Sequence, residues 1–261
     1  MTFLNALYTE FLKLRRTKIT WIIGLAFCFA PLGIGFFMLI IMNPDLAQHM
    51  GLLTTKAQLT IPAADWATYL KFTAIIMGTG SFVLGIMAAY VFGREYMQGT
   101  AKNMLTLPVG RAAFTAAKLV VTAVWYTAVI VSVYVVAIVF GLVIGLPGWA
   151  PSLLPDNIGL VLQLLVQTLL LGSVPAWMAI LGRGILAPIG FTIFAALALG
   201  QLFSHTGWGV WCPWSIPLLT AQAGAQNAPV PGLGSWIVLV IVFAAGVFAT
   251  WITLDRADNT Q

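Results

Sequence analysis

Six long apolar stretches alternate with shorter polar segments along the chain. They cover about residues 21–42, 69–92, 119–145, 158–181, 185–203 and 235–254. A helix needs roughly 20 residues to cross a hydrocarbon core about 30 Å thick, and each stretch is about that long. Strands of a membrane barrel would instead alternate polar and apolar residues over about 10 positions. The pattern therefore predicts an all-α integral membrane protein with six transmembrane helices.

The first 18 residues follow a different pattern. Leu4, Leu7, Phe11 and Leu14 recur at helical spacing, with polar residues between them. The polar residues of interest are Glu10, Lys13, Arg15 and Arg16. An amphipathic helix of this kind lies in the plane of the membrane interface. We expect residues 1–18 to form such an interfacial helix, residues 19–257 a single transmembrane domain, and residues 258–261 a short tail.

Composition agrees with a membrane protein. Charged residues make up only 7% of the chain and the mean hydropathy is +0.99, whereas soluble proteins carry about 25% charged residues. The net charge of +5 does not indicate a nucleic-acid partner, because the basic residues flank the spans and form no continuous patch. Cys28 and Cys212 provide neither a disulfide framework nor the spacing of metal ligands.

Basic residues near the span ends predict the orientation. With the N-terminus in the cytosol, ten of them are cytosolic and only Lys56 and Lys71 are external. The ten are Lys13, Arg15, Arg16, Lys18, Arg94, Lys102, Arg111, Lys118, Arg183 and Arg256. Because the number of spans is even, we expect both termini in the cytosol.

The polar segment between the second and third stretches, residues 93–118, is longer than a simple connection of about 2–8 residues. Within it, Thr100 follows Gly99 and is suited to start a helix, and Pro108 is suited to end it. Lys102 lies on one side of this short helix and Leu105 on another. The segment is thus predicted to be a cytosolic amphipathic helix that a soluble partner can bind.

A second unusual loop, residues 204–234, precedes the last span and contains Trp208, Trp211 and Trp214 but no Lys or Arg. It is too apolar for a solvated loop and too rich in proline for a span. We expect a re-entrant helical hairpin at the outer face, since tryptophan favours the headgroup level. Its tryptophans are either membrane anchors or an outer gate.

The sequence lacks several kinds of functional residue. The spans contain almost no ionisable residue of the sort that proton-coupled transporters use, and the chain has no glycine-rich phosphate loop ending in Lys-Ser or Lys-Thr. His49, His205, Asp45 and Asp65 are scattered over two loops without metal-ligand spacing. We expect no metal and no catalytic residue in this chain.

Ser81 is the one candidate nucleophile, because it lies among glycines in a span. No residue within a span could act as its base. Ser81, Gly85 and Ala89 are instead small residues four apart, a pattern that lets membrane helices approach closely.

Two segments resemble a known family. The run Glu95-Tyr96-x-x-Gly99-Thr100-x-Lys102-x-x-Leu105-x-x-Pro108-x-x-Arg111 resembles the cytoplasmic loop of permease subunits of type-2 ABC exporters. The run from Glu10 to Lys18 is similar to the surface helix before their first span. The number of spans and the loop before the last one also match, so the resemblance covers essentially the whole chain.

This resemblance implies an exporter in a bacterial plasma membrane, built from two permease chains, identical or homologous, and two ABC ATPase subunits. The ATPase subunits would hold ATP and Mg, and this chain would hold no cofactor. Residues 99–107 would form the coupling helix, with Arg94 and Glu95 at its entrance and the interfacial helix beside it. The apolar spans suit a hydrophobic or amphipathic cargo, such as a drug, a peptide antibiotic or bacteriocin, or a lipid-linked molecule.

Two alternatives remain open from the sequence. The chain could be a non-transporting anchor or an immunity or sensing subunit that recruits a soluble ATPase through the same loop. It could also be an intramembrane serine hydrolase that uses Ser81.

Overall fold

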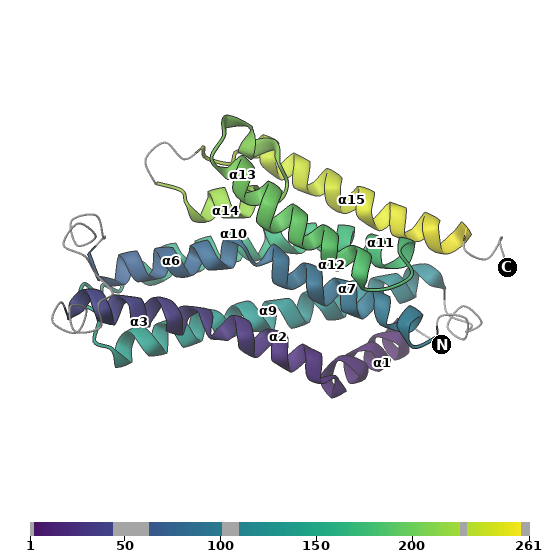
Figure 1. Ribbon diagram of the computed structural model, residues 1–261, viewed down its shortest axis with the longest axis horizontal. Helices are drawn as coiled ribbons and strands as arrows, with labels where there is room; N and C mark the ends of the chain where they lie inside the picture. Colours follow the sequence, from purple (N-terminus) through teal and green to yellow (C-terminus); the bar gives the residue numbers. More distant parts are fainter. Residues whose placement is uncertain (1–2, 44–62, 101–109, 225–228, 257–261) are drawn as a thin grey trace.

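The computed structural model describes residues 3–43, 63–100, 110–224 and 229–256, and the regular structure within these ranges is all helical. The helices run lengthwise through one bundle, and both chain termini lie at the same end of it (Figure 1). Six stretches are long and apolar enough to cross a membrane: Lys18–Met42, Trp66–Met97, Arg111–Val143, Leu153–Leu181, Leu186–Ser204 and Leu233–Asp255. The prediction of an all-α protein with six spans is confirmed.

The chain begins with α1 (Phe3–Arg16), which turns at Thr17 into the first span. This span consists of α2 (Lys18–Cys28) and α3 (Ala30–Met42). Thr17 adopts an extended conformation, with φ of −90° and ψ of 126°, so that α1 and α2 are separate helices that meet at a corner (Figure 1).

The second and fourth spans are each interrupted by a break between two helices. The second consists of α6 (Trp66–Gly78) and α7 (Ser81–Met97), and the fourth of α10 (Leu153–Leu171) and α11 (Ser173–Leu181). Gly172, at the second interruption, packs against α7, because a Cβ atom there would lie 3.0 Å from Leu84 Cδ2. The two interrupted spans therefore contact each other close to one of their breaks.

The third span, α9 (Arg111–Val143), is a continuous helix of 33 residues. It begins eight residues before the apolar stretch that predicts it, so Lys118 lies inside the helix. The fifth span consists of α12 (Leu186–Thr192), a π-helical segment η1 (Ile193–Leu199) and α13 (Gly200–Ser204).

Short helices fill the loop before the last span, α15 (Leu233–Arg256). They are the 3-10 helix η2 (Gly207–Trp211) and α14 (Ile216–Ala221). All six residues of α14 are buried, and Gly78 of α6 lies so close that a Cβ atom on it would be 2.9 Å from the carbonyl oxygen of Pro217. Helix α14 thus packs into the bundle, and the depth of this loop in a bilayer stays a prediction.

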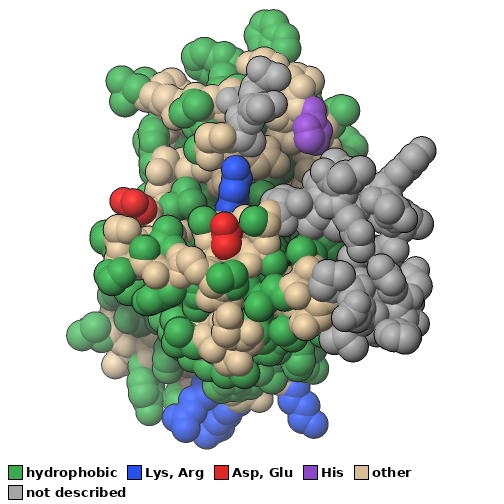
Figure 2. Space-filling model, turned by 90° about the vertical axis from the view of Figure 1, so that its left-hand side faces the viewer, with side chains coloured by type: hydrophobic (Ala, Val, Ile, Leu, Met, Phe, Trp, Pro, Cys, Tyr) green, Lys and Arg blue, Asp and Glu red, His purple; other side chains and the backbone are tan. Residues whose placement is uncertain are grey.

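The second and fourth spans form the interior of the bundle. Within their most apolar windows, 67% and 56% of residues are buried, against 22% in the first and sixth spans. Figure 2 views the end of the bundle opposite the chain termini and shows hydrophobic side chains over the flanks of the molecule. These exposed flanks are the surfaces that can face lipid or another membrane chain.

Candidate functional site

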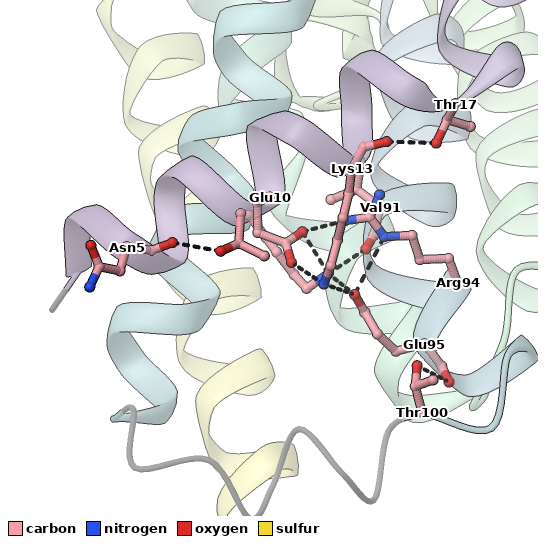
Figure 3. A network of polar contacts seen from close by, with 10 residues as sticks. Asn5, Glu10, Lys13, Thr17, Val91, Arg94, Glu95 and Thr100 are labelled. Atoms are coloured by element: carbon pink, nitrogen blue, oxygen red, sulfur yellow. Dashed lines mark hydrogen bonds and ion pairs between the residues drawn. The ribbon is translucent and has the colours of Figure 1, made fainter. Parts of the chain in front are cut away.

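A cluster of five charged side chains joins α1 to the ends of α7 and α9 near the chain termini. The cluster consists of Glu10, Lys13, Arg94, Glu95 and Lys118. Figure 3 shows Glu10 and Lys13 from α1 pointing toward Arg94 and Glu95 from α7. Helical spacing explains why Glu10 faces inward: Ala6, Glu10 and Leu14, each four residues apart, form the buried stripe of α1. The interfacial helix is therefore held to the bundle by charge as well as by apolar contact.

Each carboxylate of the cluster has more than one cationic partner. Glu10 pairs with Lys13 Nζ at 2.7 Å, with Lys118 Nζ at 3.2 Å and with Arg94 Nη2. Glu95 Oε1 lies 2.7 Å from Lys118 Nζ, 3.4 Å from Arg94 Nε and 3.6 Å from Lys13 Nζ. Because Lys118 pairs with both carboxylates, and Arg94 and Lys13 each pair between α1 and α7, moving any one of the three helices disturbs its ion pairs with the other two.

Lys118 is at the centre of this cluster and is only 1% exposed. Its ammonium group also donates to the carbonyl oxygen of Val91 at 2.6 Å and lies 4.9 Å from the centre of the Phe114 ring. A buried ammonium is costly unless it is paired and hydrogen-bonded, and here the two carboxylates and the carbonyl meet that need.

The cations of the cluster favour the ionised form of Glu10. The three cations and two carboxylates of the cluster leave a formal charge of +1. Burial disfavours the charged form of Glu10, but Lys118, Arg94 and Lys13 outweigh this effect and hold the pKa of the Glu10 carboxyl below its usual value. The Glu10 carboxylate thus anchors α1 to the bundle through ion pairs.

Two predicted site residues, Gly99 and Thr100, form the C-terminal cap of α7. Gly99 has φ of +67°, the amide of Gly99 donates to the carbonyl of Tyr96, and the amide of Thr100 donates to the carbonyl of Glu95 at 3.0 Å. This is the Schellman arrangement in which glycine adopts the left-handed conformation. The hydroxyl of Thr100 also donates to the Glu95 carbonyl. The cap thus fixes where the chain leaves α7, directly beside the charge cluster.

The rest of the predicted coupling helix lies outside the described residues. Lys102, Leu105 and Pro108 belong to this segment, so their roles stay predictions. The segment ends beside Arg111, the first residue of α9, which donates to the carbonyl of Leu254 at 3.0 Å and pairs with Asp255. Arg111 therefore ties the start of α9 to the end of α15 and lies apart from the charge cluster.

A second turn lies against α7 next to the cluster. Gly93 contacts the Gly182–Gly184 turn between the fourth and fifth spans, because a Cβ atom on Gly93 would lie 2.8 Å from Gly184. Tyr96, three residues further along α7, is half-buried against the main core. The connection that follows α7 and the Gly182–Gly184 turn therefore both contact α7 at this end of the bundle.

Other predicted residues lie away from this cluster. Arg15 and Arg16 are exposed at the end of α1. Trp208 and Trp211 are 72% and 57% exposed on η2, whereas Trp214 packs edge to face against Phe191 of the fifth span. The three tryptophans thus do not form one group, and an outer gate stays a prediction.

Ser81 has the environment of a packing residue. It is the buried first residue of α7. Four residues on, Gly85 lies against α12, where a Cβ atom would be 2.3 Å from Thr192 Cγ2.

Asp65 is one of the four residues considered as metal ligands. Its side chain accepts a hydrogen bond from the amide of Thr68 at the start of α6. Asp45 and His49 lie outside the described residues.

Lys118 is the cluster residue that sequence reasoning did not place in the site. The sequence feature that could have indicated its role is a single lysine directly before an apolar run, two helical turns after Arg111. Charge patterning showed that it flanks the third span, but its partners are 23 and 108 residues away in sequence.

Comparisons with known proteins agree with this architecture. A family model described as an ABC-2 family transporter protein matches residues 6–199, which include the charge cluster. The bacitracin transport permease protein BCRB of Bacillus licheniformis is 25% identical over 190 residues, covering 70% of this chain and 88% of that protein. The family match extends over more than half of the chain, and six helices can span a membrane. The chain therefore belongs to the ABC-2 family of transporter proteins, as a multi-pass membrane permease.

Proposed function

We propose that the chain forms, with an identical or homologous partner, the translocation pathway of an exporter driven by separate ATPase subunits. ABC-2 permeases have ATPase partners in general. The proposed docking site is the connection between α7 and α9 together with α1. Hydrolysis of Mg-bound ATP would take place in the partner, and this chain would convert the partner's motion into helix movement.

The charge cluster is the observation that supports this proposal most strongly. It lies where the docking connection leaves α7, and it joins that helix to α1 and α9 through buried ion pairs. Removing one partner of a buried pair leaves an uncompensated charge, so such contacts hold their helices in a defined geometry. A force on the connection would therefore move three helices together.

We propose an amphipathic peptide antibiotic as the cargo class. The relative in Bacillus licheniformis is named as a bacitracin transport permease, and the spans of this chain present mainly apolar side chains. Bacitracin is thus the first compound to test, ahead of hydrophobic drugs and lipid-linked molecules.

The test is a flux assay in vesicles that contain the permease and its ATPase. Glu95→Ala should lower ATP-dependent bacitracin transport at least about tenfold, because it removes the carboxylate nearest the docking connection. A double change, Gly99→Ala with Thr100→Ala, should act in the same direction through the cap of α7. Asp156→Ala is the matched control, because Asp156 is an exposed carboxylate in the first turn of α10.

Unchanged transport in both Glu95→Ala and the double variant, at equal amounts of protein in the membrane, would contradict the proposed docking site. ATPase binding without any transport would instead favour an anchor or immunity subunit.

A further inference from the structure

An apolar groove of about 470 Å³ runs between the α1–α2 corner and α9. Phe11 and Leu14 form its α1 side, Gly24 and Leu25 its α2 side, and Ala128 part of its α9 side. The lining extends over nine residues of both α2 and α9, from Thr20 to Cys28 and from Val124 to Ser132, which is about 12 Å along each helix. The groove thus lies along two transmembrane helices and suits a linear apolar chain.

Three cations surround one end of this groove. Arg15 lines it, and Arg16 and Lys18 are exposed beside it at the α1–α2 corner. Among the described residues, no carboxylate pairs with any of the three. Figure 2 shows Lys and Arg side chains projecting from the lower edge, the side on which α1 and α2 lie in Figure 1. The groove therefore combines an apolar body with a positively charged mouth.

The corner has further polar groups, and the hydroxyl of Thr20 is without a hydrogen-bond partner. Thr17, the residue before α2, makes no side-chain cap, because its hydroxyl donates back to the carbonyl of Lys13. Thr20, in the first turn of α2, lines the groove, is 4% exposed and has a hydroxyl without a hydrogen-bond partner. The indole of Trp21 donates to the carbonyl of Arg15 at 3.1 Å, which places a tryptophan at the mouth, where such side chains favour the lipid headgroup level.

We propose that this groove binds an anionic phospholipid, with an acyl chain between α2 and α9 and the phosphate at Arg15, Arg16 and Lys18. The cations and the uncapped start of α2 suit a phosphate, and the apolar walls suit the chain. Because α1 carries Glu10 and Lys13, a lipid bound here stabilises the helix that holds the charge cluster.

Native mass spectrometry of the full chain in neutral detergent tests this proposal. The probes are phosphatidylglycerol and phosphatidylcholine with identical acyl chains, and wild type should prefer phosphatidylglycerol by about tenfold. Arg15→Gln combined with Arg16→Gln and Lys18→Gln should abolish the preference, and Arg15→Gln alone should reduce it. Arg183→Gln, which removes an exposed cation elsewhere, should leave it unchanged.

A second variant tests the apolar part of the site. Ala128→Phe fills the groove from the exposed face of α9 and should weaken binding of both lipids, whereas Val135→Phe on the same helix should not. Glycerol phosphate, the headgroup without chains, should not displace the lipid. Equal binding of the two lipids to wild type, a preference that survives the triple change, or full binding by Ala128→Phe would each overturn the proposal.

Discussion

At the scale of single residues, Lys118 places an ammonium group between two carboxylates and a main-chain carbonyl inside the protein. Lys118→Met removes the cation and leaves Glu10 and Glu95 buried with fewer partners. Breaking a buried ion pair in this way costs about 3–5 kcal/mol. We expect a loss of that size in the free energy of unfolding, measured by denaturant titration in mixed micelles.

Lys71→Met is the control for this change, since Lys71 is an exposed lysine of α6 and exposed substitutions usually change stability by less than about 0.5 kcal/mol. Equal losses in the two variants would show that burial of Lys118 among acids carries no special weight.

Glu10 gives the charge cluster a dependence on pH. Its folded-state pKa lies below the usual value of 4.5, so its ionised form stabilises the fold fully above that value. This contribution is lost as the pH falls below 4.5 and through the lower folded-state pKa. Wild type should therefore lose more stability than Glu10→Gln between about pH 5 and about pH 3. Thermal unfolding of both proteins across this range measures the difference, and parallel curves would contradict it.

At the scale of helices, hydropathy predicted the spans but not their interruptions. The hydropathy of a stretch predicts how long and how apolar a span is. Interruptions depend instead on where backbone hydrogen bonds are lost. They occur after Gly78, at Gly172 and in the π-helical segment after Thr192. Pro175 and Pro188 indicate kinks in the fourth and fifth spans, and both are the third residue of a helix. Pro175 lies three residues after the break at Gly172. A missing amide hydrogen at the third position of a helix costs no helical hydrogen bond.

The candidate site was predicted in the same partial way. Local spacing and charge identified α1 as an amphipathic helix and the end of α7 as the start of a polar segment, and the family resemblance implied that the two lie side by side. The pairing of Glu10 with Arg94 joins residues 84 positions apart, and a single sequence carries no signal for such a contact. The end of α7 shows the same limit: Thr100 is expected to start the following helix, which lies outside the described residues, and its described contacts cap the helix that precedes it.

Packing between α7 and α12 depends on a glycine. A Cβ atom on Gly85 would lie 2.3 Å from Cγ2, 2.6 Å from Oγ1 and 3.1 Å from Cβ of Thr192. Gly85→Ala should therefore destabilise the protein by about 1–3 kcal/mol, as overpacking does. Thr192→Ala removes the first two of these atoms and should recover much of the loss in the double variant. A double variant no more stable than Gly85→Ala alone, measured by the same denaturant titration, would show that the strain arises elsewhere.

At the scale of the whole molecule, the bundle has two chemically different ends. One end holds both chain termini, the charge cluster and the Gly182–Gly184 turn (Figure 1). The other holds the tryptophan-bearing η2 helix, separated from that turn by the length of the fifth span. A permease that is driven by a cytosolic ATPase needs its docking connection at the cytosolic end. The proposed function therefore depends on which end of the bundle faces the cytosol.

Cysteine labelling measures that orientation. In a chain whose Cys28 and Cys212 are replaced by Ser, the changes Trp208→Cys and Arg183→Cys place one thiol near each end of the fifth span, both at exposed positions. Basic residues near span ends are retained in the cytosol, and Arg183 belongs to the end with most of them. A membrane-impermeant maleimide should therefore label Trp208→Cys in intact cells, and Arg183→Cys only after the cells are permeabilised. The cysteine-free chain should stay unlabelled in both conditions. The reverse pattern would place the charge cluster outside the cell, where no ATPase could dock, and labelling of both positions in intact cells would show that the fifth helix does not cross the membrane.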